Sequence, residues 1–176
     1  DQQGATSVES FYKTDTDAEQ AVAAVYFQWR SQAYNDFFLK NCLSDDVNSG
    51  GGSRGDNAIL EQLNEYKFSP SNSTASGYFS GLYTLIYRAN LVINNFTEES
   101  ATKKKAIAEA KVARAWAYFN LVTLWGPVPL VTKPLSPSEY QQPNGVITER
   151  WALIEKDLNE AISSGALPEK SGVSDK

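Results

Sequence analysis

Histidine and methionine are absent from the 176 residues, and cysteine occurs once, at position 42. Without histidine the chain has no Ser-His-Asp or Cys-His nucleophile and no His-x-x-x-His zinc helix. A single cysteine also excludes an intrachain disulfide, a zinc knuckle and an iron–sulfur site. Cys42 falls within the alternating polar and apolar segment Phe37 to Leu43, so it is predicted to pack as a small apolar residue.

Positive charge is also scarce, since 16 Lys and Arg face 21 Asp and Glu and give a net charge of −5. This net negative charge argues against electrostatic binding to nucleic acid or to anionic lipid. No apolar run reaches the ~18 residues that predict a membrane-spanning helix. The 41% hydrophobic and 12% aromatic content instead predicts one globular unit with its own core.

Apolar side chains recur at helical spacing, so the chain is predicted to be all-α. The first predicted helix begins at Thr16. Three more are predicted over about 58–66, about 75–95 and about 100–125, and a last one contains Trp151 and ends near Gly165. Their expected boundaries are a capping box over Thr16 to Glu19, an Asn57 cap, and a stop at Gly126-Pro127.

Long irregular loops separate these helices. Residues 44–57 and 69–74 are rich in Ser, Asn, Asp and Gly, which favour turns. The proline-rich segment from Pro127 to Gly145 is an extended connection, with Val128 to Val131 as the one candidate strand. Loops of this length in compact domains are often functional.

Two chemistries are open within the loops and the short helix. The segment from Asp46 begins like a calcium loop but lacks the closing Glu, which leaves a looser calcium site as an alternative to no metal and no cofactor. Glu61 and Glu65 lie one helical turn apart and could form the carboxylate pair of a glycosidase. A solvated helix face explains this pair better, because nothing nearby raises a carboxyl pKa.

The stretch from Glu109 to Val131, EAKVARAWAYFNLVTLWGPVPLV, closely resembles the signature of the SusD/RagB family of outer-membrane lipoproteins. Three other pieces agree in order and spacing: Asp17-Ala18 at the start of a helix, the segment YTLIYRAN from Tyr83 to Asn90, and the segment IEKDL from Ile154 to Leu158. The resemblance covers essentially the whole chain.

This resemblance implies tetratricopeptide-like antiparallel helices, an α-α superhelix with long irregular loops. Residues 1–176 would be the N-terminal helical region of a larger SusD-like fold, without its C-terminal part. Because the sequence has no Met, Asp1 is not expected to be a translation start. The family pattern implies a signal peptide and a lipidated cysteine upstream of Asp1, an anchor in the outer membrane, and a TonB-dependent transporter as partner.

By the same resemblance, the ligand surface uses the loops Asp45 to Asn57 and Tyr66 to Thr74. Within them we predict Asp46, Arg54, Asn57, Tyr66, Phe68 and Asn72 as contacts to an oligosaccharide. Phe68 stands where starch-binding members carry a Trp platform, so it offers a smaller stacking surface. Arg114, Glu109 and Arg88 are predicted to form a structural ion network between the helices at about 75–95 and 100–125.

The predicted function is therefore non-enzymatic binding of a glycan at the cell surface and its delivery to the transporter. One alternative is a helical scaffold half that docks the transporter or the missing C-terminal part and has no ligand site of its own. The other is a glycosidase that uses Asp46 or Glu61.

Overall fold

A computed structural model describes residues 11–44 and 46–168. Within them lie six α-helices and one 3-10 turn: α2 (Asp15–Ser31), α3 (Ala33–Cys42), α4 (Ala58–Asn64), α5 (Ser73–Asn95), α6 (Ala101–Trp125), η1 (Pro137–Glu139) and α7 (Ile147–Ser163). The predicted all-α class is confirmed. No helix in the described residues combines the length and the apolarity needed to cross a membrane.

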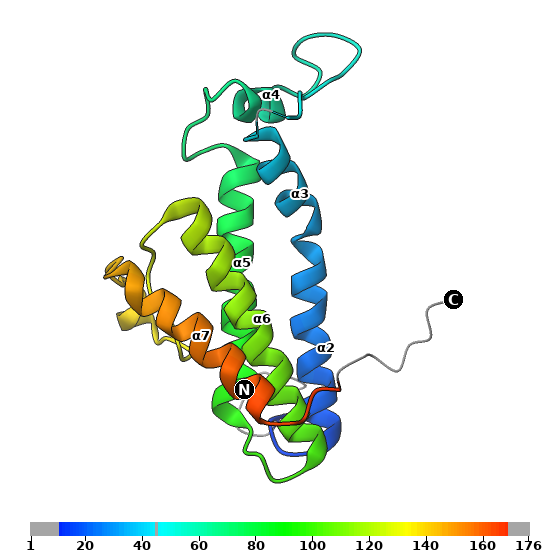
Figure 1. The fold of residues 1–176 in the computed structure, drawn as a ribbon, viewed down its shortest axis with the longest axis vertical. Helices are drawn as coiled ribbons and strands as arrows, with labels where there is room; N and C mark the ends of the chain where they lie inside the picture. Colours follow the sequence, from blue (N-terminus) through cyan, green and yellow to red (C-terminus); the bar gives the residue numbers. More distant parts are fainter. Residues whose placement is uncertain (1–10, 45, 169–176) are drawn as a thin grey trace, which may run out of the picture.

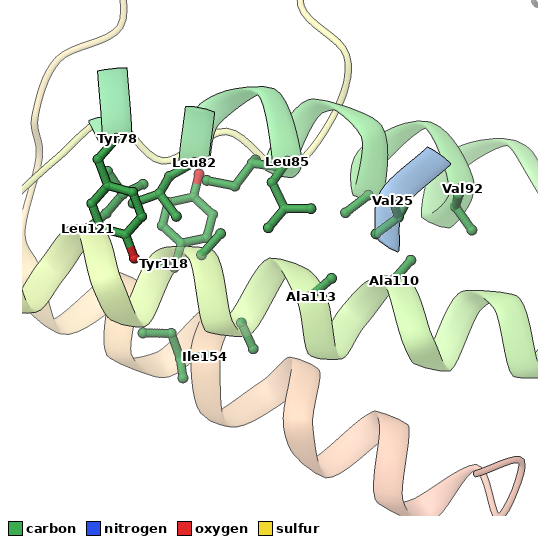
Figure 2. Close-up of a cluster of buried hydrophobic side chains, with 14 of the residues drawn as sticks. Val25, Tyr78, Leu82, Leu85, Val92, Ala110, Ala113, Tyr118, Leu121 and Ile154 are labelled. Atoms are coloured by element: carbon green, nitrogen blue, oxygen red, sulfur yellow. The ribbon is translucent and has the colours of Figure 1, made fainter. Parts of the chain in front are cut away.

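The helices pack around α6, which contacts α2, α5 and α7. The helices α5 and α7 run antiparallel to α6, whereas α2 runs parallel to it (Figure 1). Alanines at 110, 113 and 117 are fully buried along α6, and their small side chains let the neighbouring helices approach closely. Larger residues such as Leu82, Leu85 and Leu121 fill the remaining space (Figure 2). The resulting core follows the predicted apolar stripes.

The N-cap of the first helix lies two residues before the predicted one. Thr14, not Thr16, is the N-cap: its side chain accepts from the Asp17 backbone N–H at 3.1 Å, and the Asp17 carboxylate accepts from the Thr14 N–H at 2.7 Å. Thr14 has the extended backbone that an N-cap requires. The alternative pair at Thr16 and Glu19 lies inside the helix.

Residues 37–42 are helical, although their sequence pattern suggests alternation. Leu39 and Cys42 are buried three residues apart on α3, and Phe38 packs against the core beside them. Cys42 is 2% exposed, which confirms that it packs as an apolar residue. This burial raises the pKa of its thiol. With only Gln32 between them, α2 and α3 form a nearly continuous rod along one side of the molecule (Figure 1).

The segment after α6 is extended but is not a strand. Tyr118 Oη accepts from the Val131 N–H at 2.6 Å and donates to the Val131 carbonyl at 3.1 Å. Asn90 Nδ2 donates to the same carbonyl at 3.0 Å, and Tyr83 Oη donates to the Pro129 carbonyl at 2.8 Å. Side chains from α5 and α6 thus replace the partner strand that this backbone would otherwise need.

A buried ion pair joins this segment to three helices. Arg114 on α6 donates from Nε and Nη2 to the two Asp157 carboxylate oxygens on α7, both at 2.7 Å. Its Nη1 donates to Asn90 Oδ1 at 2.7 Å and to the Thr132 carbonyl at 3.3 Å. Every hydrogen bond is therefore made between different elements, and both charges are almost fully buried.

The predicted network of Arg114, Glu109 and Arg88 is wrong. Arg88 donates to the Ala24 carbonyl of α2 at 2.7 Å, and Glu109 approaches Lys105 on its own helix at 3.9 Å. The true partner of Arg114 is Asp157, 43 residues away in the sequence. Helical spacing places residues on a face but does not identify a partner on another helix.

Replacing Asp157 with Asn is expected to destabilise the fold strongly, because Arg114 would remain buried without a counter-charge. We expect a loss of about 3–5 kcal/mol in the free energy of unfolding, measured by urea denaturation at pH 7. Glu155→Gln, on the exposed face of α7, is the control and should change stability by less than about 0.5 kcal/mol. A loss below about 1 kcal/mol in the Asp157 variant would contradict the assigned role.

Stability is also expected to fall between pH 10 and 12. Burial raises the pKa of Tyr118 to about 12, against about 10 for an unfolded tyrosine. Below pH 10 Tyr118 is protonated in both states, so its full contribution to stability is present. Above pH 10 the unfolded chain releases this proton first, and the free energy of unfolding then falls by about 1.4 kcal/mol per pH unit up to the folded pKa. Urea titrations from pH 9 to 12 should show a shallower pH slope in Tyr118→Phe than in the wild type, and equal slopes would refute the assignment.

Candidate functional site

The polar loops gather around α4, at one end of the long α2–α3 rod (Figure 1). Asn64 at the end of α4 donates from Nδ2 to the Val47 carbonyl at 2.9 Å and accepts from the Ser49 N–H at 3.2 Å. Glu61 accepts from the Gly55 N–H at 2.7 Å. Thus α4 holds the described part of the 46–57 loop through its own side chains.

The loop and α4 enclose a polar hollow of about 350 Å³. Arg54 and Glu65 form an ion pair on its wall, and Glu65 also accepts from Lys67 at 3.0 Å. The hydrogen bond from Lys67 and the Arg54 guanidinium lower the pKa of the Glu65 carboxyl. The Arg54 side chain is 78% exposed, so its remaining donors face solvent. The hollow is lined by Asn48, Ser49, Gly50, Gly51, Ser53, Arg54, Glu61, Asn64 and Glu65.

An aromatic hollow of about 410 Å³ lies where the start of α5 meets the end of α6. Phe79 and Trp125 form one wall, with ring centroids 5.3 Å apart in an edge-to-face arrangement. Phe68 forms another wall and is 42% exposed. The floor and rim come from Ser69, Pro70, Ala75 and Ser76.

The 65–72 segment connects the two hollows, because Glu65 lines the polar one and Phe68 lines the aromatic one. Tyr66 lies between them with a positive φ of 54°. Tyr66 is 60% exposed, and its hydroxyl donates to the Leu43 carbonyl at 2.6 Å. This bond fixes the ring while leaving its faces accessible.

The six predicted contact residues differ in their exposure to solvent. Asp46, Arg54, Asn57, Tyr66 and Phe68 are exposed around α4 and the 65–72 segment, whereas Asn72 is 4% exposed. Asn57 accepts from the Leu60 N–H at 3.4 Å as the predicted cap of α4. Asp45, the first residue of the predicted loop, lies outside the described residues.

Asn72 caps α5 and its amide is fully used. Its Oδ1 accepts from the Thr74 and Ala75 N–H groups at 3.2 and 3.3 Å, and its Nδ2 donates to the Ile59 carbonyl at 3.0 Å. The residue therefore ties α4 to α5. An amide that is buried and occupied in this way has nothing left for a ligand, so we leave Asn72 out of the site.

Sequence reasoning missed Trp125 and Phe79 as parts of this surface. The apolar spacing of the helix at about 100–125 predicts Trp125 on its buried side, but Trp125 is only partly buried. The available signal was its place in the last turn, directly before Gly126 and Pro127. A large ring at the very end of a helix lies at the edge of the core.

A looser calcium site in the 46–57 loop stays a prediction. The Asp56 carboxylate turns inward and accepts from the Ser53 N–H at 2.8 Å and the Ser53 hydroxyl at 2.9 Å. Within residues 11–44 and 46–168, no three carboxylate or thiol side chains lie close enough to hold a metal ion together.

The comparisons with known proteins cover nearly the whole chain. A family described as "Starch-binding associating with outer membrane", of the SusD-like type, matches residues 5–174. The chain belongs to this SusD-like family. A SusD-like protein of Bacteroides ovatus is 30% identical over 88% of the chain, and SusD-like protein P38 of Formosa agariphila is 31% identical over 88%.

Solved structures of SusD-like proteins share the fold. A laminarin-binding SusD-like protein is 35% identical, with a TM-score of 0.78 over 92% of this chain and 36% of its own. A structure described as having a xylogluco-oligosaccharide is 29% identical, with a TM-score of 0.65 over 88% of this chain and 30% of its own. The chain spans about a third of the length of these relatives, including 29% and 31% of the two curated proteins.

The capping role of Asn72 predicts a stability effect. Asn72→Ala is expected to lower the free energy of unfolding by about 1–2 kcal/mol, because it removes the cap of α5 and the side-chain hydrogen bond to the Ile59 carbonyl of α4. Ser71→Ala, at the exposed neighbouring position, is the control. Equal thermal unfolding curves for the two variants would show that Asn72 is not a structural cap.

Proposed function

We propose that this SusD-like chain binds a glycan at the cell surface without cleaving it, and that the whole protein delivers the glycan to a TonB-dependent transporter. The relatives support the ligand class, since one is described as laminarin-binding and another as having a xylogluco-oligosaccharide. The association of the family with the outer membrane supports the location. A lipid anchor upstream of Asp1 is part of the same proposal.

The single observation that carries the ligand proposal is the 65–72 segment, which lines a polar hollow and an aromatic hollow at once. A sugar ring has the same division, with C–H groups on its faces and hydroxyls around its edge. Pockets that fix such ligands combine a mainly apolar lining with a few placed polar groups. A ligand that crosses this segment would meet both kinds of surface.

Each remaining predicted residue has a role in this arrangement. Phe68 stacks on a sugar face at the mouth of the aromatic hollow, and Tyr66 offers a second ring held by its bond to Leu43. Arg54 donates to hydroxyls from the wall of the polar hollow, with Glu65 as its acceptor neighbour. Asp46 and Asn57 contribute exposed polar groups at the rim.

The carboxylates near the hollows support binding without hydrolysis. A glycosidase needs one carboxylic acid that stays protonated near neutral pH. The Lys67 and Arg54 contacts shift the pKa of Glu65 in the opposite direction, and Glu61 is engaged with the Gly55 N–H. We therefore expect no release of reducing ends from an oligosaccharide incubated with the protein.

A helical scaffold is the second candidate function, and one observation favours it. Three apolar side chains on α7 lie in one exposed stripe: Ile147, Leu158 and Ile162. Exposed apolar patches often mark surfaces that contact another part of a protein or a partner. This candidate predicts no affinity for oligosaccharides, so a binding measurement separates the two functions.

Phe68→Ala is expected to weaken binding of a neutral oligosaccharide about tenfold, equivalent to about 1.4 kcal/mol. Titration calorimetry with laminarihexaose and a xyloglucan heptasaccharide provides the measurement. Phe37→Ala is the matched control, because Phe37 is 60% exposed on α3 and lines neither hollow. Unchanged affinity in the Phe68 variant, or an equal loss in the control, would contradict the proposed site.

A further inference from the structure

A third hollow, of about 370 Å³, lies in the groove between α2 and the start of α6, outside the loops described above. Its floor consists of small or buried apolar residues, chiefly Ala18, Val22 and Ala106. Because alanine side chains end at Cβ, the two helices leave space between them here. The volume falls in the range of small-molecule sites, about 300–1,000 Å³.

Tyr26 forms an aromatic wall of this groove and is held in place from behind. Its ring lies almost parallel to that of Trp29, at an interplanar angle of 5° and a centroid distance of 6.2 Å. Trp29 in turn packs against Trp116 of α6, with centroids 5.2 Å apart. Tyr26 as a residue is still 47% exposed, so these contacts orient its ring without closing it off from solvent.

Polar groups surround the apolar floor. Glu19 comes from α2, while Thr102, Lys105 and Glu109 come from α6. Burial raises the pKa of the Tyr26 phenol, and the nearby Glu109 carboxylate raises it further, which keeps the phenol a donor. The rim therefore carries both donors and acceptors above an apolar floor.

We propose that this groove is a second saccharide site, which takes a neutral pyranose unit. The apolar floor and the Tyr26 ring suit the C–H face of a sugar, and the rim suits its hydroxyls. A wholly apolar ligand would cover the Glu19 and Glu109 carboxylates without offering either a hydrogen-bond donor, at a cost in desolvation. The inference extends the proposed glycan binding to another face of the molecule.

Charge narrows the ligand class further. The lining has two carboxylates, Glu19 and Glu109, against the single ammonium of Lys105, which already approaches Glu109 at 3.9 Å. A uronate or sulfated unit would be set against a net negative rim. The groove thus selects neutral over anionic glycans.

Amide shift mapping by NMR on the 176-residue chain tests this site separately from the loops. With laminarihexaose or a xyloglucan heptasaccharide as probe, the backbone amides of Ala23 and Ala106 should shift, and an oligogalacturonate should leave them unchanged. Tyr26→Ala should weaken the groove response at least tenfold and leave the shifts around Glu65 intact. Tyr26→Phe and Glu109→Gln, milder changes, should weaken it about threefold, and Tyr34→Ala is the control on the exposed face of α3.

The outcomes distinguish this inference from the proposed function. Amide shifts around Glu65 alone overturn the groove site and support the loop site. Amide shifts at the groove alone overturn the loop site and support the groove site. No shift with either neutral probe overturns both. Equal binding of the oligogalacturonate at the groove overturns the assigned ligand class, as does a groove response that all the Tyr26 and Glu109 variants retain.

Discussion

A buried guanidinium needs a counter-charge and a full set of acceptors, and Arg114 meets both needs by joining elements that are distant in sequence. Asp157 supplies the charge from α7, Asn90 supplies an acceptor from α5, and the Thr132 carbonyl supplies one from the connecting segment. None of these groups can move away without leaving a buried polar atom unpaired. The relative positions of α5, α6, α7 and the connection all depend on this one residue.

The segment that connects α6 and α7 is held in place by side chains of the helices around it. Prolines prevent regular pairing of its backbone, and its carbonyls are bonded instead by Tyr83, Asn90 and Tyr118. Arg150, also buried, donates to the Val128 carbonyl at 2.7 Å and to the Val146 carbonyl at 2.9 Å. The helices thus impose a single path on a long irregular segment.

Local sequence signals predicted the helices well because apolar periodicity and caps act over a few residues. The Asn57 cap and the stop at Gly126 are both observed, the latter with a positive φ of 72°. Signals failed where the outcome depended on distant partners. Asn72 looked the same in sequence whether it capped a helix or faced a ligand, and Asp157 gave no sign that it faced Arg114. Trp125 and Tyr26 needed the packing of neighbouring helices before their exposed surfaces could be recognised.

The helical core and the 46–57 loop are held by separate sets of hydrogen bonds. The core helices are bonded to one another, whereas the 46–57 loop is bonded to Glu61 and Asn64 of the short helix α4 and to Glu65 directly after it. Insertions, deletions or exchanges in that loop would therefore leave the Arg114 network untouched. The fold separates the part that must stay constant from the part that can vary. Such a fold can acquire new ligand preferences through changes in the 46–57 loop and α4, while the residues of the core stay the same.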